Sequence, residues 1–383
     1  MFTLIENGEV YTPAAAGPRS VLLSDNKILK IGAVDRAALE ALGVETEYVD
    51  AGGCIVTPGF IDPHQHLLGG SGESGFASQT PEVALNEIVL AGITTVVGCL
   101  GADTTTKTQE GLLAKVKGLK EEGLNAFMWT GGYSVPPACV TASVKTDMMF
   151  IEEVLGIGEI AIADDRSSEP SAEELARLAS DAYVAGTLAK KAGVVHIHIG
   201  DKPARLEVIW KALEDKSVKP EWFYLTHITR SDELMLDAIK LAKMGACVDI
   251  DTVDEDLAEK LTFYLDNGGP PDKLTISSDA SITSPHNVFD QIRACVLEAG
   301  FAIEDVLPIV TRNTAAALNL EAKGEIAVGK IADVLVIEKS NFALRDVFSK
   351  GRRLVREGRP EHVEKFLDES NRTIILKGRE ARV

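Results

Sequence analysis

The sequence predicts an α/β protein built on a (β/α)8 TIM barrel, with a small β-sandwich domain formed by the two ends of the chain. Eight short apolar runs alternate with helix-like stretches between residues 55 and 280. Many of these runs lack polar alternation, which is typical of parallel strands covered on both faces. Eight such strands separated by helices fit most simply into a closed barrel. The expected strands span 55–61, 93–98, 125–130, 159–163, 194–199, 222–226, 246–250 and 274–278.

The stretches between these runs carry helix start signals. Ser171 precedes a run of helix-forming residues, and Glu174 follows three positions later. This spacing is typical of a capping box, in which each side chain bonds to the backbone of the other residue. A helix is therefore expected to begin directly after Ser171.

The flanks of the chain differ in character from its centre. Residues 1–54 contain short strands with turn signals between them, and the chain returns to this pattern from residue 324. Neither flank is long enough to bury a good core alone. We therefore expect residues 1–54 and 324–383 to pair into one β-sandwich domain beside a hydrolase barrel of residues 55–323.

Length and composition suit a soluble enzyme. A chain of 383 residues with 45% hydrophobic and 25% charged residues can bury a large core. A formal net charge of −19 argues against nucleic-acid binding, so an acidic substrate would need arginines in the site. The absence of long apolar runs and of a signal-like start predicts a cytoplasmic protein that does not enter membranes. The five scattered cysteines indicate reduced core thiols.

Two histidines, His64 and His66, follow the first apolar run and are separated by one glutamine. Alternate residues of an extended segment point to the same side, so both imidazoles can bind one metal ion. The spacing alone leaves open that they are two surface histidines.

Further potential ligands stand at the ends of later runs. His198 ends the fifth expected strand, His227 follows the sixth, and Asp279 follows the eighth. Imidazoles and a carboxylate gathered at the rim of a barrel are what a hydrolytic transition-metal site requires. His196 alternates with His198, so it is either a neighbour of that ligand or a satisfied core histidine.

The chain resembles a known superfamily at both ends of the expected barrel. The segment 57–66 is similar to the opening strand of the amidohydrolase superfamily, and 324–336 is similar to its return to the small β-domain. Within this superfamily the chain most resembles the isoaspartyl dipeptidases, and the resemblance covers essentially its whole length. The segments that carry this finer resemblance are Gly69–Glu73, Thr130–Pro136, Asp164–Ser168, Thr226–Arg230 and Ser277–Asp279.

The resemblance implies a two-metal peptidase, normally with zinc, in which a hydroxide bridging the ions attacks the amide. His64 and His66 would bind one ion, and His198 and His227 would bind the other. Asp279 would bind the first ion and carry a proton from the nucleophile to the departing amine.

The sequence departs from the family at the group that bridges the metals. Many isoaspartyl dipeptidases use a carboxylated lysine there, but residues 154–166 contain no lysine. Counting back from Arg166, the position carries Glu159, whose carboxylate offers two oxygens on a shorter arm. Gly158 could let the backbone move inward to compensate. The alternative is a solvated Glu159 at a strand start and a site that holds one metal or is degenerate, but we expect Glu159 to bridge.

The substrate-binding set is also implied by the resemblance. Tyr133 would hydrogen-bond the developing oxyanion. Arg166 and Arg230 follow the fourth and sixth expected strands, where guanidinium groups can pair bidentately with carboxylates. Glu73 lies in a glycine-rich loop, where it can pair with a free ammonium group. The alternative for each charged residue is a salt bridge at the rim with no role in substrate binding.

Two further positions differ from the family pattern. Thr283, counted here with the substrate-binding residues, stands where a serine is expected, and Ala102 stands where a threonine is expected. Both changes leave the chemistry intact and could alter the preferred side chain of the substrate.

The function predicted from these features is hydrolysis of β-aspartyl (isoaspartyl) dipeptides by a metalloprotease of the amidohydrolase superfamily. A cyclic amidase, such as a dihydroorotase or dihydropyrimidinase, is the alternative, and a non-catalytic protein on a decayed enzyme scaffold is a third class. Glu73 favours the dipeptidase, because a cyclic ureide has no free ammonium group. The expected partners are a small dipeptide and further copies of the chain, since relatives are commonly octameric.

Overall fold

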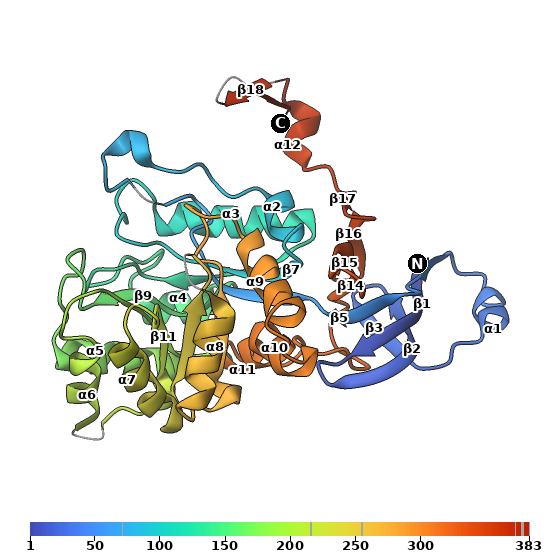
Figure 1. Ribbon diagram of the computed structural model, residues 1–383. Helices are drawn as coiled ribbons and strands as arrows, with labels where there is room; N and C mark the ends of the chain where they lie inside the picture. Colours follow the sequence, from blue (N-terminus) through green and yellow to red (C-terminus); the bar gives the residue numbers. More distant parts are fainter. Residues whose placement is uncertain (71, 215–216, 254–255, 372, 377–378, 383) are drawn as a thin grey trace.

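The structure is a computed structural model, which describes residues 1–383 except 71, 215–216, 254–255, 372, 377–378 and 383. Its centre is a sheet of eight parallel strands that follow one another in chain order (Figure 1). This arrangement confirms the predicted α/β barrel. The strands are β6 (Phe60–Gln65), β7 (Ile93–Gly98), β8 (Asn125–Thr130), β9 (Val154–Ile162), β10 (Val195–Ile199), β11 (Phe223–Thr226), β12 (Cys247–Asp251) and β13 (Leu274–Ser277).

The first and last barrel strands meet at their carboxyl ends. Gln65 forms a parallel bridge with Ala280, and the backbone N–H of His66 donates to the carbonyl of Ala280 at 2.6 Å. Asp62 strengthens this junction, because one carboxylate oxygen accepts from the backbone N–H groups of both His64 and Ser278. The sheet therefore closes at the edge where the potential ligands gather.

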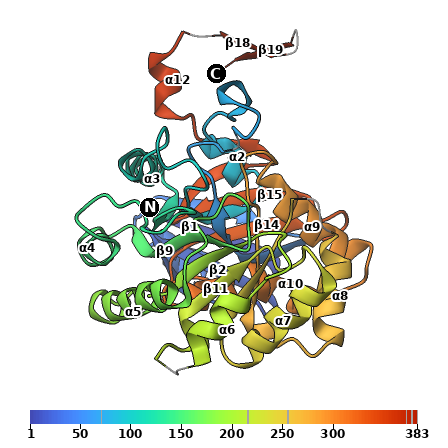
Figure 2. The ribbon, with the colours of Figure 1, turned by 90° about the vertical axis from the view of Figure 1, so that its left-hand side faces the viewer.

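Helices surround the strands, as Figure 2 shows for α5 to α10. The predicted capping box is confirmed, because the Ser171 side chain accepts from Glu174 N–H and the Glu174 side chain accepts from Ser171 N–H. No helix within the described residues is long and apolar enough to cross a bilayer. The helices are α1 (Arg36–Glu40), α2 (Leu85–Val89), α3 (Gln109–Glu122), α4 (Val144–Phe150), α5 (Ala172–Ala189), α6 (Glu207–Glu214), α7 (Asp232–Lys243), α8 (Leu257–Asp266), α9 (His286–Leu297), α10 (Ile303–Val310), α11 (Arg312–Ala317) and α12 (Lys365–Glu369). Single 3-10 turns span Phe76–Ser78, Pro220–Trp222 and Pro271–Lys273.

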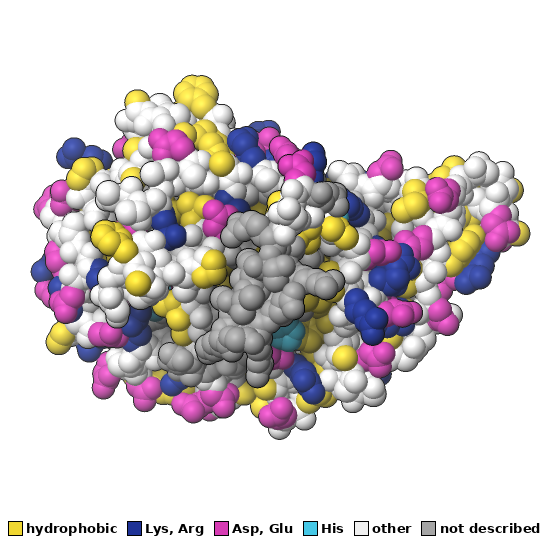
Figure 3. Space-filling model, turned by 90° about the horizontal axis from the view of Figure 1, so that it is seen from above, with side chains coloured by type: hydrophobic (Ala, Val, Ile, Leu, Met, Phe, Trp, Pro, Cys, Tyr) yellow, Lys and Arg dark blue, Asp and Glu magenta, His cyan; other side chains and the backbone are white. Residues whose placement is uncertain are grey.

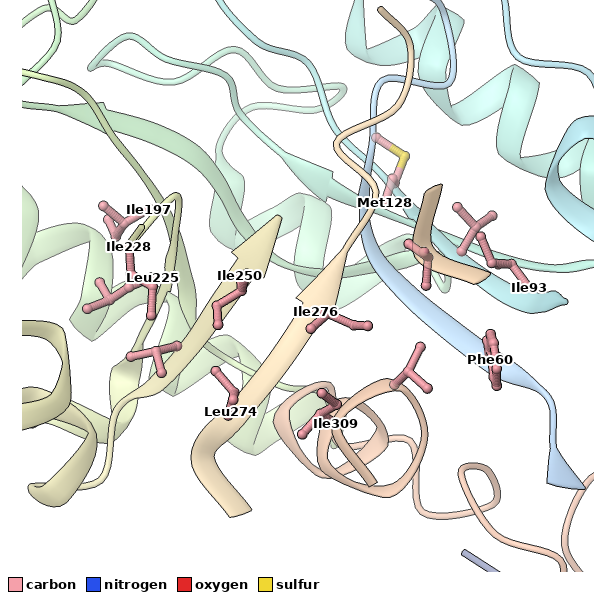
Figure 4. Packing of buried hydrophobic residues seen from close by; sticks show 14 of the residues in the cluster. Phe60, Ile93, Met128, Ile197, Leu225, Ile228, Ile250, Leu274, Ile276 and Ile309 are labelled. Atoms are coloured by element: carbon pink, nitrogen blue, oxygen red, sulfur yellow. The ribbon is translucent and has the colours of Figure 1, made fainter. Parts of the chain in front are cut away.

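A large apolar core lies between the strands and the helices. Figure 4 shows part of it, with Leu274 and Ile276 of β13 beside Ile309 of α10. Fully buried strands of this kind hold the backbone rigidly, so side chains at the strand ends are held in fixed positions.

Two strand predictions were wrong in their bounds. The expected strand 55–61 is two strands, because Cys54–Pro58 (β5) pairs with the small sheet and only Phe60 onward belongs to the barrel. The chain changes sheets at Gly59, where a Cβ atom would lie 2.1 Å from Thr94 Oγ1. A continuous apolar run conceals this crossing. The fourth strand was expected from residue 159 but already begins at Val154. Its first half contains Gly156 and Gly158, which are buried within the strand.

The small domain contains strands from both ends of the chain, as predicted. They form one nine-stranded mixed sheet in the order β17-β16-β15-β14-β5-β1-β2-β3, with β4 paired to β1. Its strands enclose a separate apolar cluster that includes Val21, Val56 and Val336. The exact domain boundaries stay a prediction. The strands are β1 (Phe2–Tyr11), β2 (Ala15–Ser24), β3 (Lys27–Ile31), β4 (Thr46–Asp50), β14 (Val334–Glu338), β15 (Leu344–Ser349), β16 (Arg352–Arg356) and β17 (Arg359–Pro360); a separate hairpin contains β18 (Thr373–Leu376) and β19 (Arg379–Arg382).

The face of the molecule seen in Figure 3 carries acidic and basic side chains interspersed with each other. At the carboxyl end of the barrel, by contrast, the side chains of His64, Glu159, His198 and His227 are buried beneath the surface.

Candidate active site

All predicted metal ligands lie at one end of the barrel. His64 is in β6 and His198 in β10, while His227 directly follows β11. Glu159 lies within β9, and Asp279 follows β13 by two residues. Parallel strands place their carboxyl ends on the same rim, so five segments distant in sequence meet there.

The first group of ligand atoms surrounds one oxygen of Glu159. His64 Nε2 lies 3.5 Å from Glu159 Oε1 and 3.3 Å from Asp279 Oδ1. His66 Nε2 lies 3.4 Å from Glu159 Oε1 and 3.2 Å from Asp279 Oδ1. Nitrogen and oxygen ligands of a tetrahedral zinc ion lie about 3.4 Å apart. These four nitrogen–oxygen distances therefore match those within the coordination shell of one ion.

The second group lies around the other oxygen of the same carboxylate. Glu159 Oε2 is 3.2 Å from His198 Nδ1 and 4.0 Å from His227 Nε2. The two oxygens of Glu159 thus face different pairs of histidines.

Several atoms of this cluster are buried without hydrogen-bond partners. They are His64 Nε2, Glu159 Oε1 and His227 Nε2, although buried polar atoms in proteins are nearly always paired. Burial opposes ionisation of Glu159, but His64 and His198 outweigh it and hold the pKa of this carboxyl well below its usual range. Buried imidazole nitrogens without hydrogen-bond partners, gathered around an ionised carboxylate, are suitable ligands for a divalent metal ion.

Acidic residues fix two of the histidines in the form that a metal needs. His198 Nε2 lies 3.0 Å from Asp164 Oδ2, and His227 Nδ1 lies 2.7 Å from Asp251 Oδ2. A ring nitrogen that carries the proton can donate it to the carboxylate, and the opposite ring nitrogen then keeps a lone pair for an ion. Sequence reasoning missed Asp251, although its place at the end of the seventh strand was a usable signal.

His64 is held through a second histidine. Its Nδ1 lies 2.9 Å from His196 Nε2, and His196 Nδ1 lies 3.2 Å from the carbonyl oxygen of Tyr224. Burial, aided by the nearby His64, lowers the pKa of His196 well below its usual value. A neutral His196 donates to the carbonyl and accepts from His64, which leaves His64 Nε2 free. One alternative for His196 was a neighbour of the ligand His198. The structure places it beside a predicted ligand, but that ligand is His64.

Tyr133 reaches the same cluster from the loop after β8. Its hydroxyl lies 2.9 Å from His198 Nδ1, and the side chain is almost fully buried. Burial is the main reason, and the charge of Glu159 the second, that the pKa of Tyr133 is raised well above its usual value. The phenol therefore stays neutral and can donate a hydrogen bond.

A cavity of about 290 Å³ opens from this cluster to solvent. The predicted substrate-binding residues line its wall together with Asp279 and Tyr133, so the structure brings both predicted sets into one space. The predicted residues in the wall are Glu73, Arg166, Arg230, Thr283 and Ala102. Ser71, in the same glycine-rich segment as Glu73, lies outside the described residues.

The arginines at this wall are already paired with acidic side chains. Arg166 forms two bonds of 2.8 Å to Asp164 and one of 2.5 Å to Glu73. Arg230 lies 3.0 Å from Asp201. The Arg166 and His198 contacts hold the pKa of Asp164 far below its usual range. A salt bridge at the rim was the alternative considered for each of these charged residues, although the partners of the arginines were not predicted. An anionic ligand would have to share or replace these pairs.

Comparison with known proteins agrees with this geometry. The model of the amidohydrolase family matches residues 55–354. The chain belongs to the amidohydrolase family. The match covers the whole barrel and, of the strands that return to the small sheet, β14, β15 and the first part of β16.

Two solved structures are similar over nearly the whole chain. The crystal structure of β-aspartyl dipeptidase from Fervidobacterium islandicum AW-1 is 37% identical, with a TM-score of 0.89, and the match covers 95% of this chain and 99% of that one. A structure of β-aspartyl dipeptidase from the same organism with β-Asp-Leu dipeptide is 35% identical, with a TM-score of 0.88 and the same coverage. The predicted resemblance to isoaspartyl dipeptidases is thereby confirmed.

A curated relative of different activity is more distant. Adenine deaminase 2 of Agrobacterium fabrum is 25% identical over 321 residues. The match covers 82% of this chain, which spans about half the length of that relative.

Proposed function

We propose that the chain is a metallo-dipeptidase that hydrolyses β-aspartyl dipeptides. The observation that carries this proposal is a single cavity in which a buried histidine and carboxylate cluster adjoins two arginines and a glutamate. The cluster suits hydrolysis, and the three charged residues suit a small substrate with two carboxylates and one ammonium group. The similarity to β-aspartyl dipeptidases supports the same assignment.

The metal centre would contain two divalent ions, most simply zinc, with Glu159 as the bridge in place of a carboxylated lysine. His64, His66 and Asp279 would hold the first ion, and His198 and His227 would hold the second. This assignment is supported by the way each oxygen of Glu159 faces a different histidine pair. When bound, the two ions would lower the pKa of water enough for attack on an amide at neutral pH.

Asp279 is suited to move the proton in this reaction. Its carboxylate lies at the boundary between the buried histidines and the cavity, with 23% of its side chain exposed. From there it can take a proton from the attacking water and pass it to the departing amine. Tyr133, as a neutral donor, would hydrogen-bond the oxygen of the scissile carbonyl as negative charge develops on it.

The substrate's charges correspond to those of the cavity wall. A β-aspartyl dipeptide carries a free α-ammonium and α-carboxylate on the aspartate and a carboxylate on the second residue. Arg166 and Arg230 can bind the carboxylates, and Glu73 can bind the ammonium group. The ammonium would then replace Arg166 as the partner of Glu73, and this exchange frees one edge of the guanidinium.

The test is a comparison of kcat/KM for β-Asp-Leu, α-Asp-Leu and dihydroorotate, measured with the zinc-loaded protein. β-Asp-Leu should be preferred, because the α-linked isomer holds its charged groups at other distances from the scissile carbonyl, and a displacement of about 1 Å can cost ~10²-fold. Preference for dihydroorotate would instead support the cyclic amidase, the second candidate. Acetylating the amine of β-Asp-Leu should also lower kcat/KM, because the ammonium that would pair with Glu73 is then lost.

The setting of the enzyme is part of the proposal. We expect a cytoplasmic homo-oligomer, with an octamer as the specific candidate. All five cysteines are free thiols, which suits a reducing compartment. Exposed apolar side chains such as Phe150 and Leu188 offer surface for contacts between subunits. Light scattering during gel filtration gives the subunit count, and a monomer would contradict this part of the proposal.

A further inference from the structure

One histidine of the metal cluster differs from the other three in the partner of its second nitrogen. Two of the others face a carboxylate with that nitrogen, and the third faces an imidazole. The exception is His66, whose Nδ1 faces the sulfur of Cys99 at 3.7 Å.

Cys99 is rigidly held beside this histidine. It directly follows β7, is 1% exposed, and its backbone N–H donates to the carbonyl of Gln65 at 2.9 Å. That bond joins it to the last residue of β6, which lies between the two first-ion histidines. Its sulfur also falls within one group of ligand atoms with His64, His66 and Glu159, all within 4.8 Å of one another. No step of the proposed reaction uses this thiol.

The protonation state of His66 defines what the sulfur does. His66 Nε2 faces Glu159 and Asp279, so this nitrogen must present its lone pair to an ion. The ring proton then lies on Nδ1, where the Cys99 sulfur is placed to accept it. The sulfur contacts the nitrogen that faces away from the ion position, which favours an outer partner over a direct ligand.

We propose that Cys99 is a positioning residue that accepts a hydrogen bond from His66 Nδ1–H and so directs His66 Nε2 to the first metal position. The inference rests on the proposed metal centre, although not on its substrate. Sulfur is a weaker acceptor than the carboxylates that hold His198 and His227. Loss of this contact should still weaken binding of the ion at the first position and leave the second unchanged.

The test is release of zinc to a chelator from full-length protein, for wild type, Cys99→Ala and Cys99→Ser. Cys295→Ala is the matched control. It also removes a buried thiol, but from α9, which carries none of the cluster residues. Loss of an outer partner typically weakens metal binding by about 10–100-fold. One of the two ions should therefore leave Cys99→Ala at about 10–100-fold lower chelator concentration, while the other is unchanged.

Cys99→Ser keeps the side chain small and should lie between wild type and Cys99→Ala, so it tests the proposal even where alanine impairs folding. At saturating zinc, the KM of Cys99→Ala should match that of wild type, because the sulfur does not touch the substrate. Zinc release equal to wild type in both variants would overturn the proposal.

Cobalt substitution separates a positioning role from direct ligation. The Co²⁺-loaded wild type should show no intense sulfur-to-cobalt charge-transfer band in the near ultraviolet. Such a band, absent from Cys99→Ala, would overturn the proposal by making Cys99 a ligand. Neither measurement needs a dipeptide, so failure here is distinguishable from failure of the dipeptidase assignment.

Discussion

The buried metal cluster and the wall of the cavity above it differ in burial and in how their side chains are held. In the cluster, the side chains of His64 and Glu159 are fully buried. At the wall, the side chains of Glu73, Arg166 and Arg230 are 62%, 34% and 29% exposed. The cluster atoms are fixed by strands and outer partners, whereas the wall residues come from loops and form ion pairs at the rim.

This contrast separates two kinds of work. Unpaired cluster atoms already face the position where an ion fits, so little reorganisation is needed at the reacting centre. The wall arginines must exchange Asp164, Glu73 or Asp201 for the substrate. The free energy of binding gained there is therefore only the difference between the old and the new ion pairs. Changes in the cluster should therefore alter catalysis strongly, and changes at the wall should alter affinity and selectivity more modestly.

The largest effect is expected for Glu159→Ala. Loss of the bridging carboxylate should reduce the metal content from two ions per chain toward one. An ion supplies several kcal/mol of transition-state stabilisation, so kcat should fall by about 10³-fold or more. Elemental analysis and steady-state kinetics measure both effects, with the exposed Glu152→Ala as the control. Full activity in Glu159→Ala, or a dependence of wild-type activity on added bicarbonate, would contradict a glutamate bridge.

Asp279→Asn should rank next. Asparagine keeps an oxygen for the ion but cannot take a proton, so kcat should fall by the ~10²–10⁴-fold typical of general acid–base catalysis. Metal content should change much less. Turnover above a tenth of the wild-type value would show that another group moves the proton.

Asp251→Ala tests the outer partners of the cluster. His227 would lose the carboxylate that holds its Nδ1–H at 2.7 Å, and affinity for the second ion should weaken by about 10–100-fold. Chelator titration measures this loss, and Asp266→Ala, at the exposed end of α8, is the control. An unchanged chelator profile would mean that the backbone alone orients His227.

Arg230→Lys addresses the wall. Lysine keeps the charge and loses the planar fork, which removes about one hydrogen bond to a charged group, or ~1.5 kcal/mol. We expect kcat/KM for β-Asp-Leu to fall by about 10-fold, mainly through KM, and metal content to stay at the wild-type value. A fall in kcat with unchanged KM would place Arg230 in the chemical step instead.

The sequence was informative where a residue ends a regular strand. His64, His198 and Asp279 follow apolar runs, and strand direction alone brings such residues to one rim. Contacts between distant segments leave no comparable signal, so the pairing of His66 with Cys99 and of Arg166 with Asp164 emerges only in three dimensions. The crossing at Gly59 was missed for a related reason, because both sheets bury their strands completely and the apolar run does not change there.

The smallest effect is expected for Ala102→Thr, which changes selectivity and leaves the cluster intact. Ala102 lines the cavity beside Gly101, and a Cβ on Gly101 would lie only 3.1 Å from His66 Cε1. Space at this wall is therefore limited, and a threonine would reduce the room for the second residue of the dipeptide. One methylene in a pocket is worth about 10-fold at the lower end of its range, so the ratio of kcat/KM for β-Asp-Leu over β-Asp-Gly should fall by up to about that factor. Ala102→Ser adds the hydroxyl without the methyl group and should change the ratio less. If the ratio is the same in all three proteins, the second residue does not reach this wall, and the rigid cluster with the arginines sets the specificity instead.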